Sequence, residues 1–154
     1  MINRLAVIGV GLIGGSLALS LKSKGAVNEV VGYSRSDEAR QEALSLGIID
    51  KAADSIAEAV VDADVVFVAV PMGAMASVFA EMSEHIRPEA IITDGGSAKA
   101  QVVSSAREAL GDKFKQFVPG HPIAGTETSG TAAAFAALSE NHRHDTTRIR
   151  ENET

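Results

Sequence analysis

The chain has 154 residues, of which 45% are hydrophobic and 22% are charged. This is the balance of one ordinary globular domain that can bury a core of its own. The formal net charge of −6 argues against a surface that binds nucleic acid or a membrane. The absence of cysteine excludes disulfides, thiolate metal sites and thiol nucleophiles. The N-terminus leads directly into an apolar strand, and no apolar run reaches the length of about 20 residues that spans a bilayer, so we expect a cytoplasmic protein.

Short apolar runs alternate with longer helical patterns along the chain. In order, strands are expected at Arg4–Val10, Glu29–Tyr33, Lys51–Ala53, Asp64–Val70, Ala90–Asp94 and Lys115–Gly120. The helices between them are expected at Leu12–Gly25, Asp37–Gly47, Ser55–Ala63, Met72–Ile86 and Ala98–Gly111. Gly25 is expected just past a helix end, and Ser55 at a helix start. The alternation predicts an α/β fold: a doubly wound, mostly parallel Rossmann-type sheet with helices on both faces.

The sequence GVGLIG follows the first strand and opens the first helix. It places Gly9, Gly11 and Gly14 in the G-x-G-x-x-G pattern, with Leu12 and Ile13 inside it. In this context the pattern predicts a dinucleotide site: a tight turn, a close approach to the pyrophosphate, and a helix packed on the strand. The free N–H groups of the helix start favour an anion there. The alternative is a tight turn that binds nothing.

The end of the second strand bears on the choice of cofactor. An NAD site usually has an acidic residue there, whereas this chain has Ser34 and Arg35, and Asp37 follows at a position where it can cap a helix. A hydroxyl and a guanidinium can bind a 2′-phosphate, so the pattern favours NADP over NAD. The alternative for Arg35 is a solvated side chain that only stacks on adenine.

Val70 and Pro71 end the central strand. In a parallel sheet this end faces the cofactor groove, so we expect both residues, and Met72 after them, to line it. The alternative is a simple strand stop followed by a core methionine.

Two later segments are candidates for chemistry. Ser97 and Lys99 follow the fifth strand, where Ser97 is also a good N-cap and Lys99 opposes the helix dipole. The lysine is therefore not placed for helix stability, which points to a role in substrate binding. His121 stands between Gly120 and Pro122, which restricts its backbone, and a histidine suits proton transfer near neutral pH.

Three motifs together carry a resemblance: GVGLIGGS at Gly9–Ser16, DGGSAK at Asp94–Lys99 and GHPIAGTE at Gly120–Glu127. On these residues the chain resembles the prephenate/arogenate (cyclohexadienyl) dehydrogenase family over roughly Met1–Arg143. The resemblance implies NAD(P)-dependent oxidative decarboxylation of prephenate and/or arogenate in tyrosine biosynthesis. It implies that His121 is the catalytic base and that Ser97 orients it or touches the substrate.

The resemblance also places Thr126 and Glu127 near the substrate side chain. It implies a dinucleotide-binding domain at residues 1–143, followed by an atypical polar tail at residues 144–154. In the family a helical C-terminal domain makes the homodimer and completes the pocket, and on this resemblance we expect that domain to be absent from this chain. Two alternatives stay open: a domain of a β-hydroxyacid-type dehydrogenase, and a dinucleotide-binding module without catalysis.

Overall fold

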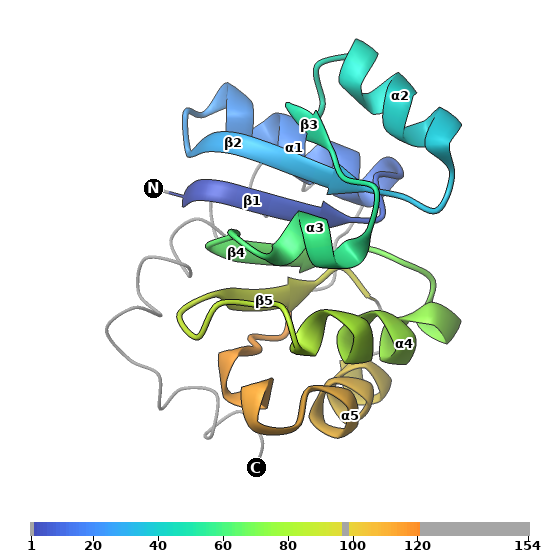
Figure 1. Cartoon of the computed structure of the whole chain (residues 1–154), viewed down its shortest axis with the longest axis vertical. Coiled ribbons are helices and arrows are strands. Elements are labelled where there is room, and N and C mark those ends of the chain that lie inside the picture. The colour runs from blue at the N-terminus through green and yellow to red at the C-terminus, as the bar shows by residue number, and fades with distance from the viewer. Residues whose placement is uncertain (1, 97–98, 121–154) are drawn as a thin grey trace.

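Five parallel strands form one sheet in the order β3-β2-β1-β4-β5 (Figure 1). This computed structural model describes residues 2–96 and 99–120, without the side chains of Leu12 and Lys99. The strands are β1 (Ile2–Ile8), β2 (Val27–Tyr33), β3 (Lys51–Ala52), β4 (Val65–Val68) and β5 (Ile91–Asp94). The helices are α1 (Leu12–Ser23), α2 (Asp37–Ser45), α3 (Ile56–Val60), α4 (Met72–Ser83), α5 (Lys99–Leu110) and the 3-10 helix η1 (Gly111–Gln116). The predicted α/β sheet is confirmed.

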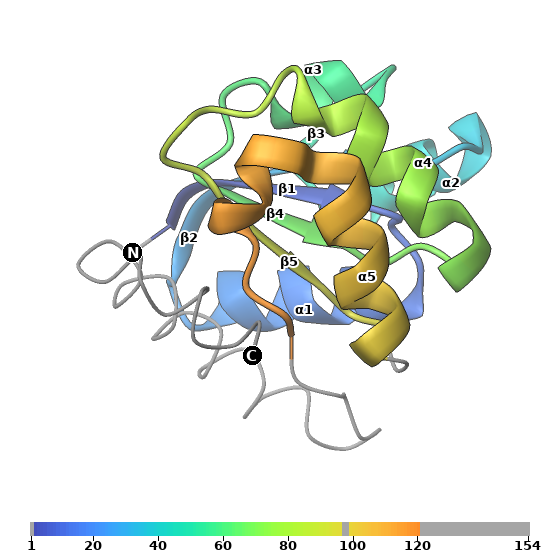
Figure 2. The ribbon, with the colours of Figure 1, turned by 90° about the horizontal axis from the view of Figure 1, so that it is seen from below.

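Helices cover both faces of this sheet, as predicted. Helix α1 lies on one face, and α3 and α4 lie on the other (Figures 1 and 2). All four residues of β4 are buried, which is why its sequence is a continuous apolar run rather than an alternating one. Within the described residues no helix is both long and apolar enough to cross a membrane.

The expected end of the first helix is confirmed. Gly25 has φ +66°, and its N–H donates to Lys22 O at 3.1 Å. The N–H of Ala26 donates to Leu21 O at 2.9 Å, which completes a Schellman motif. Glycine supplies the left-handed residue that this motif requires.

The predicted sixth strand at Lys115–Gly120 is wrong. Helix η1 runs to Gln116, and the rest of the segment pairs with β5 only through an isolated bridge between Ile92 and Phe117. The Gln116 side chain is buried and donates to two backbone oxygens, those of Arg87 and Ala90. The N–H of Gly120 donates to a side chain of β5 rather than to its backbone, so the ladder does not continue.

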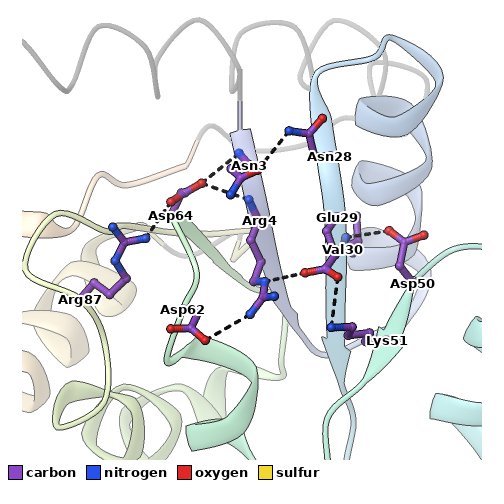
Figure 3. Close-up of polar contacts among 10 residues, drawn as sticks. All are labelled: Asn3, Arg4, Asn28, Glu29, Val30, Asp50, Lys51, Asp62, Asp64 and Arg87. Carbon is purple, nitrogen blue, oxygen red and sulfur yellow. Dashed lines mark hydrogen bonds and ion pairs between the residues drawn. The ribbon is translucent and has the colours of Figure 1, made fainter.

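The strand expected at Asp64–Val70 is shorter and runs from Val65 to Val68, and the side chain of Asp64 caps the start of β1. Its Oδ2 accepts hydrogen bonds from the N–H groups of Asn3 and Arg4, at 2.9 and 3.0 Å (Figure 3). Its Oδ1 pairs with Arg87 at 3.0 Å. Arg4 in turn pairs with Glu29 at 2.6 Å. At the amino edge of the sheet, carboxylates thus accept hydrogen bonds from backbone N–H groups and form ion pairs with arginines.

Candidate functional site

The first two segments of the candidate site, which follow β1 and β4, lie at the carboxyl edge of the sheet. The turn from β1 to α1 follows one central strand, and the segment after β4 follows the other. The chain leaves these two strands toward opposite faces, since α1 and α4 lie on different sides (Figure 2). Such a reversal is the usual place for a ligand crevice in an open parallel sheet.

Gly9 makes the tight turn that follows β1. Its φ is +100°, and a Cβ there would lie 2.3 Å from the carbonyl oxygen of Ala69. Its N–H donates to Tyr33 O at 2.8 Å. Only glycine allows this conformation and this approach, so the turn is held between the ends of β2 and β4.

Gly14 brings helix α1 against the turn. A Cβ on Gly14 would lie 2.3 Å from Gly9 O and 2.9 Å from Val7 Cγ1. The glycine therefore serves close packing of the helix on β1, as the sequence pattern predicts.

Gly11 has a different environment from the other two glycines. A Cβ there would meet nothing within 4 Å. Gly11 is also the N-cap of α1, and no described side chain caps this helix. By contrast, Ser36 caps α2 and Ser55 caps α3. The open space and the uncapped N–H groups of α1 fit an anionic group such as a pyrophosphate.

The residues after β2 carry a cation that the sequence pattern did not single out. Arg40 of α2 donates from Nη1 to Ser34 O at 2.8 Å and lies 5.7 Å from the centroid of the Tyr33 ring. It also pairs with Asp37 at 3.1 Å. Ser34 is half-buried and Arg35 is exposed. Asp37 is not the helix cap, because Ser36 accepts the bond from Ala39 N–H at 3.2 Å.

Val70 and Pro71 lie between β4 and α4, beside the glycine turn. A Cβ on Gly9 would lie 3.2 Å from Val70 Cγ1. Pro71 is exposed and forms the N-cap of α4, so it starts the helix rather than ending the strand, which stops at Val68. Met72, expected beside them in the groove, is the first residue of α4, and its partly buried side chain packs against the core.

The glycine turn also adjoins the segment after β5. Gly95 is close to α1, since a Cβ there would lie 3.0 Å from Ile13 Cγ2. Its N–H donates to Val68 O at 2.9 Å, which continues the pairing of β5 with β4. The start of the DGGSAK segment thus lies next to the predicted cofactor helix.

Asp94 links the DGGSAK segment with the start of the GHPIAGTE segment. Its carboxylate accepts hydrogen bonds from the N–H groups of Gly96 and Gly120, at 2.8 and 2.9 Å. The structure therefore brings together the leading ends of two motifs that lie far apart in the sequence.

The family model described as prephenate dehydrogenase, nucleotide-binding domain, matches residues 17–147. The chain belongs to this family. It is 41% identical over 142 residues to prephenate dehydrogenase of Bacillus subtilis (strain 168), covering 92% of this chain and 38% of that protein. It is 38% identical over 140 residues to cyclohexadienyl dehydrogenase of Zymomonas mobilis, covering 91% of this chain and 47% of that one.

A solved prephenate dehydrogenase shares the fold. The structure from A. aeolicus, in complex with hydroxyphenyl propionate and NAD+, matches with a TM-score of 0.73 and 35% identity. The match covers 82% of this chain and 44% of that one. The chain thus spans less than half the length of these members of the prephenate dehydrogenase family.

Several residues predicted for the site lie outside the part that the structure describes. They are Ser97, His121, Thr126 and Glu127, together with the side chains of Leu12 and Lys99. Sequence reasoning missed Arg40 and the linking role of Asp94. For Arg40 the available signal was its spacing of three residues from Asp37 on a helix. No local sequence pattern predicts the hydrogen bond that Gly120 N–H donates to the Asp94 carboxylate.

Proposed function

We propose that this chain is the cofactor-binding part of an enzyme that carries out NAD(P)-dependent oxidative decarboxylation of prephenate and/or arogenate, in tyrosine biosynthesis. The observation that carries the proposal is the open space at Gly11, where an uncapped helix meets the carboxyl edge of a parallel sheet. Membership of the prephenate dehydrogenase family supplies the reaction class. The polar tail at residues 144–154 and the domain boundary at residue 143 belong to the same proposal.

The cofactor is placed by the segments at the carboxyl edge of the sheet. Gly11 and the first turn of α1 would hold its pyrophosphate, together with Gly9, Leu12, Ile13 and Gly14. Ser34 and Arg35 would bind the adenosine ribose. Val70 and Pro71 would line the nicotinamide end of the site. The open space at Gly11, where a Cβ would meet nothing within 4 Å, supports this arrangement.

NADP is the preferred cofactor in this proposal, although the A. aeolicus structure is a complex with NAD+. A carboxylate beside the ribose repels a 2′-phosphate, and the first acidic residue after β2, Asp37, is paired with Arg40. The exposed Arg35 is then available for the phosphate. Arg40 adds positive charge on the same side and supports the Ser34 backbone.

Replacement of Arg35 by alanine tests the preference. A hydrogen bond to a charged group is worth about 1.5–3 kcal/mol. Arg35→Ala is therefore expected to lower the affinity for NADPH about 10- to 100-fold and the affinity for NADH much less. Arg87→Ala, at the amino edge, is the matched control and is expected to leave both affinities unchanged. Equal losses of NADPH and NADH affinity in Arg35→Ala would refute the assignment to the 2′-phosphate.

The chemistry assigns roles to residues near the nicotinamide. The bound nicotinamide supplies the acceptor for the hydride that leaves the ring carbon bearing the hydroxyl. His121 accepts the proton of that hydroxyl, and Ser97 orients His121 or contacts the substrate. Thr126, Glu127 and Lys99 contact the substrate around its side chain. Loss of CO₂ makes the ring aromatic, so the protein chiefly has to align the reactants and accept the proton.

The pH dependence of turnover tests the role of His121. The neutral imidazole is the active form, so activity is expected to fall as the pH decreases through the usual histidine pKa of about 6.5. A flat profile of activity against pH from 5 to 8 would contradict this role. Substrate is offered as prephenate and as arogenate in separate assays, which decides between the two.

The whole enzyme is proposed to be a cytoplasmic homodimer that binds neither nucleic acid nor membrane. Its dimer contacts and the rest of its substrate pocket lie in sequence beyond this chain, which spans less than half of its relatives. A second reading is a cofactor-binding module without catalysis. It is supported by the share of the relatives that this chain covers, which is less than half of their length. Cofactor binding without turnover by this chain would support the second reading.

A further inference from the structure

Asp94 is the last residue of β5, and it is almost fully buried, with 1% of its surface exposed. Its Oδ2 accepts a hydrogen bond from Gly96 N–H at 2.8 Å, and its Oδ1 accepts one from Gly120 N–H at 2.9 Å. Bonds from N–H donors to a carboxylate are stronger than neutral ones, and a buried setting strengthens them further. One side chain therefore holds two backbone segments firmly.

The packing around both donors favours this arrangement. A Cβ on Gly120 would lie 2.0 Å from Asp94 O, which requires glycine at this position. A Cβ on Gly96 would lie 2.7 Å from Val102 Cγ2 and 3.1 Å from Asp94 Oδ2. The absence of side chains at these two positions lets both backbones reach the same carboxylate.

We propose that Asp94 is a positioning residue that couples the segment leading to Ser97 with the segment leading to His121. This inference rests on the proposed function, in which those two residues act on the substrate. Each lies one residue beyond a clamped glycine, and adjacent Cα atoms are about 3.8 Å apart. The clamp therefore ties together Gly96 and Gly120, the described residues from which the chain continues to Ser97 and to His121. A misplacement of about 1 Å in such a pair can cost about 100-fold in rate.

Two substitutions separate the clamp from a general effect on folding. Asp94→Asn keeps nearly the same volume, but its amide offers one acceptor oxygen in place of two. It can therefore hold one of the two glycine N–H groups and must release the other. Asp94→Ala releases both. Asp50→Asn is the matched control, because Asp50 also accepts a backbone N–H, that of Val30, at the opposite edge of the sheet.

The experiment measures amide hydrogen exchange at Gly96 and Gly120 by NMR, the Kd of NADPH, and turnover with prephenate and arogenate. In Asp94→Ala both amides are expected to exchange at least tenfold faster, and in Asp94→Asn one of them. The Kd of NADPH is expected to stay within about threefold of wild type, which also shows that each variant is folded. The value of kcat is expected to fall at least tenfold, and Asp50→Asn to change none of these quantities.

Unchanged exchange at both glycines in Asp94→Ala would overturn the clamp. An unchanged kcat in that variant, with both amides released, would overturn its positioning role. If the wild-type chain binds NADPH but turns over neither substrate, this supports the second reading, a cofactor-binding module without catalysis. The exchange pattern of the two Asp94 variants then still decides whether one carboxylate couples the two segments.

Discussion

At the scale of single residues, the three glycines of the first turn differ in what surrounds them. Gly9 and Gly14 are required by the fold, since a Cβ on either would lie 2.3 Å from a backbone oxygen. Gly11 faces open space and is required by neither packing nor its φ of −99°. The same residue type in one motif thus serves internal packing at two positions and faces open space at the third.

Gly14→Ala is expected to destabilise the protein by about 1–3 kcal/mol, because the new methyl group has to displace Gly9. Gly15→Ala, one residue further along α1, is the control. Its Cβ would lie 3.7 Å from Ile48, an ordinary contact, so helix propensity should stabilise this variant by about 0.5–1 kcal/mol. Urea unfolding measures both changes, and a Gly14→Ala variant as stable as Gly15→Ala would contradict the close packing.

Asp50 makes stability depend on pH. Burial alone would raise the pKa of its carboxyl, but the hydrogen bond from Val30 N–H and the Lys22 ammonium together outweigh burial and lower the pKa below its ordinary value of 3.8. A carboxyl with a lowered pKa in the folded state stabilises the protein above the unfolded pKa. This contribution is lost as the pH falls below 3.8 and through the folded pKa.

In Asp50→Asn the free energy of unfolding is therefore expected to fall near neutral pH and to depend less steeply on pH in the acid range. The carboxylate is partly exposed, so solvent screening limits the change to about 0.5–1 kcal/mol. Asp54→Asn, at an exposed position two residues after the end of β3, is the control. Parallel acid-unfolding curves for wild type and Asp50→Asn would show that the pairing contributes nothing.

At the scale of elements, the helix starts differ in how their N–H groups are satisfied. Ser36 and Ser55 cap α2 and α3, whereas no described side chain caps α1. Ser55→Ala is expected to cost about 0.5–2 kcal/mol of stability and to leave the Kd of NADPH unchanged. Thermal unfolding and fluorescence titration measure the two effects, and a large loss of NADPH affinity would show that α3 takes part in the site.

The sequence predicts most elements, because their signals are local. Apolar runs mark the buried strands, and glycine marks the end of α1 with its positive φ. The segment at Lys115–Gly120 looks like a strand by the same criterion, yet the Asp94 carboxylate takes the N–H of Gly120 and the ladder stops. Such competition between a side chain and a backbone partner depends on residues far apart in the sequence, and a local pattern does not contain it.

In the candidate site, too, some residues follow from a local motif and others are placed only by the fold. The positions of Gly9, Gly11 and Gly14 follow from one motif, and the structure shows close packing at Gly9 and Gly14 and open space at Gly11. Arg40 belongs to an ordinary helical pattern, and only the fold places it over Tyr33 and against Ser34. The proposed roles of Ser97 and His121 stay predictions from the family resemblance.

At the scale of the whole molecule, the two edges of the sheet have different roles. Ion pairs and side-chain caps hold the amino edge, where Asp64 bonds to β1 and Asp50 bonds to β2 (Figure 3). The carboxyl edge gathers the glycine turn, the segment around Ser34 and the Asp94 clamp. Substitutions at the amino edge are therefore expected to change stability and to leave the affinity for NADPH unchanged.

The central claim is that a dinucleotide binds over Gly11, and titration of NADPH against Gly11→Val tests it most directly. A valine side chain there enters space that the protein leaves open, but valine is a poorer N-cap than glycine, so the thermal midpoint should fall by only about 2–4 °C. We expect wild type and Gly15→Ala to bind NADPH with the same Kd, and Gly11→Val to bind at least tenfold more weakly. Equal binding by Gly11→Val, or no saturable binding by the wild-type chain, would contradict the account.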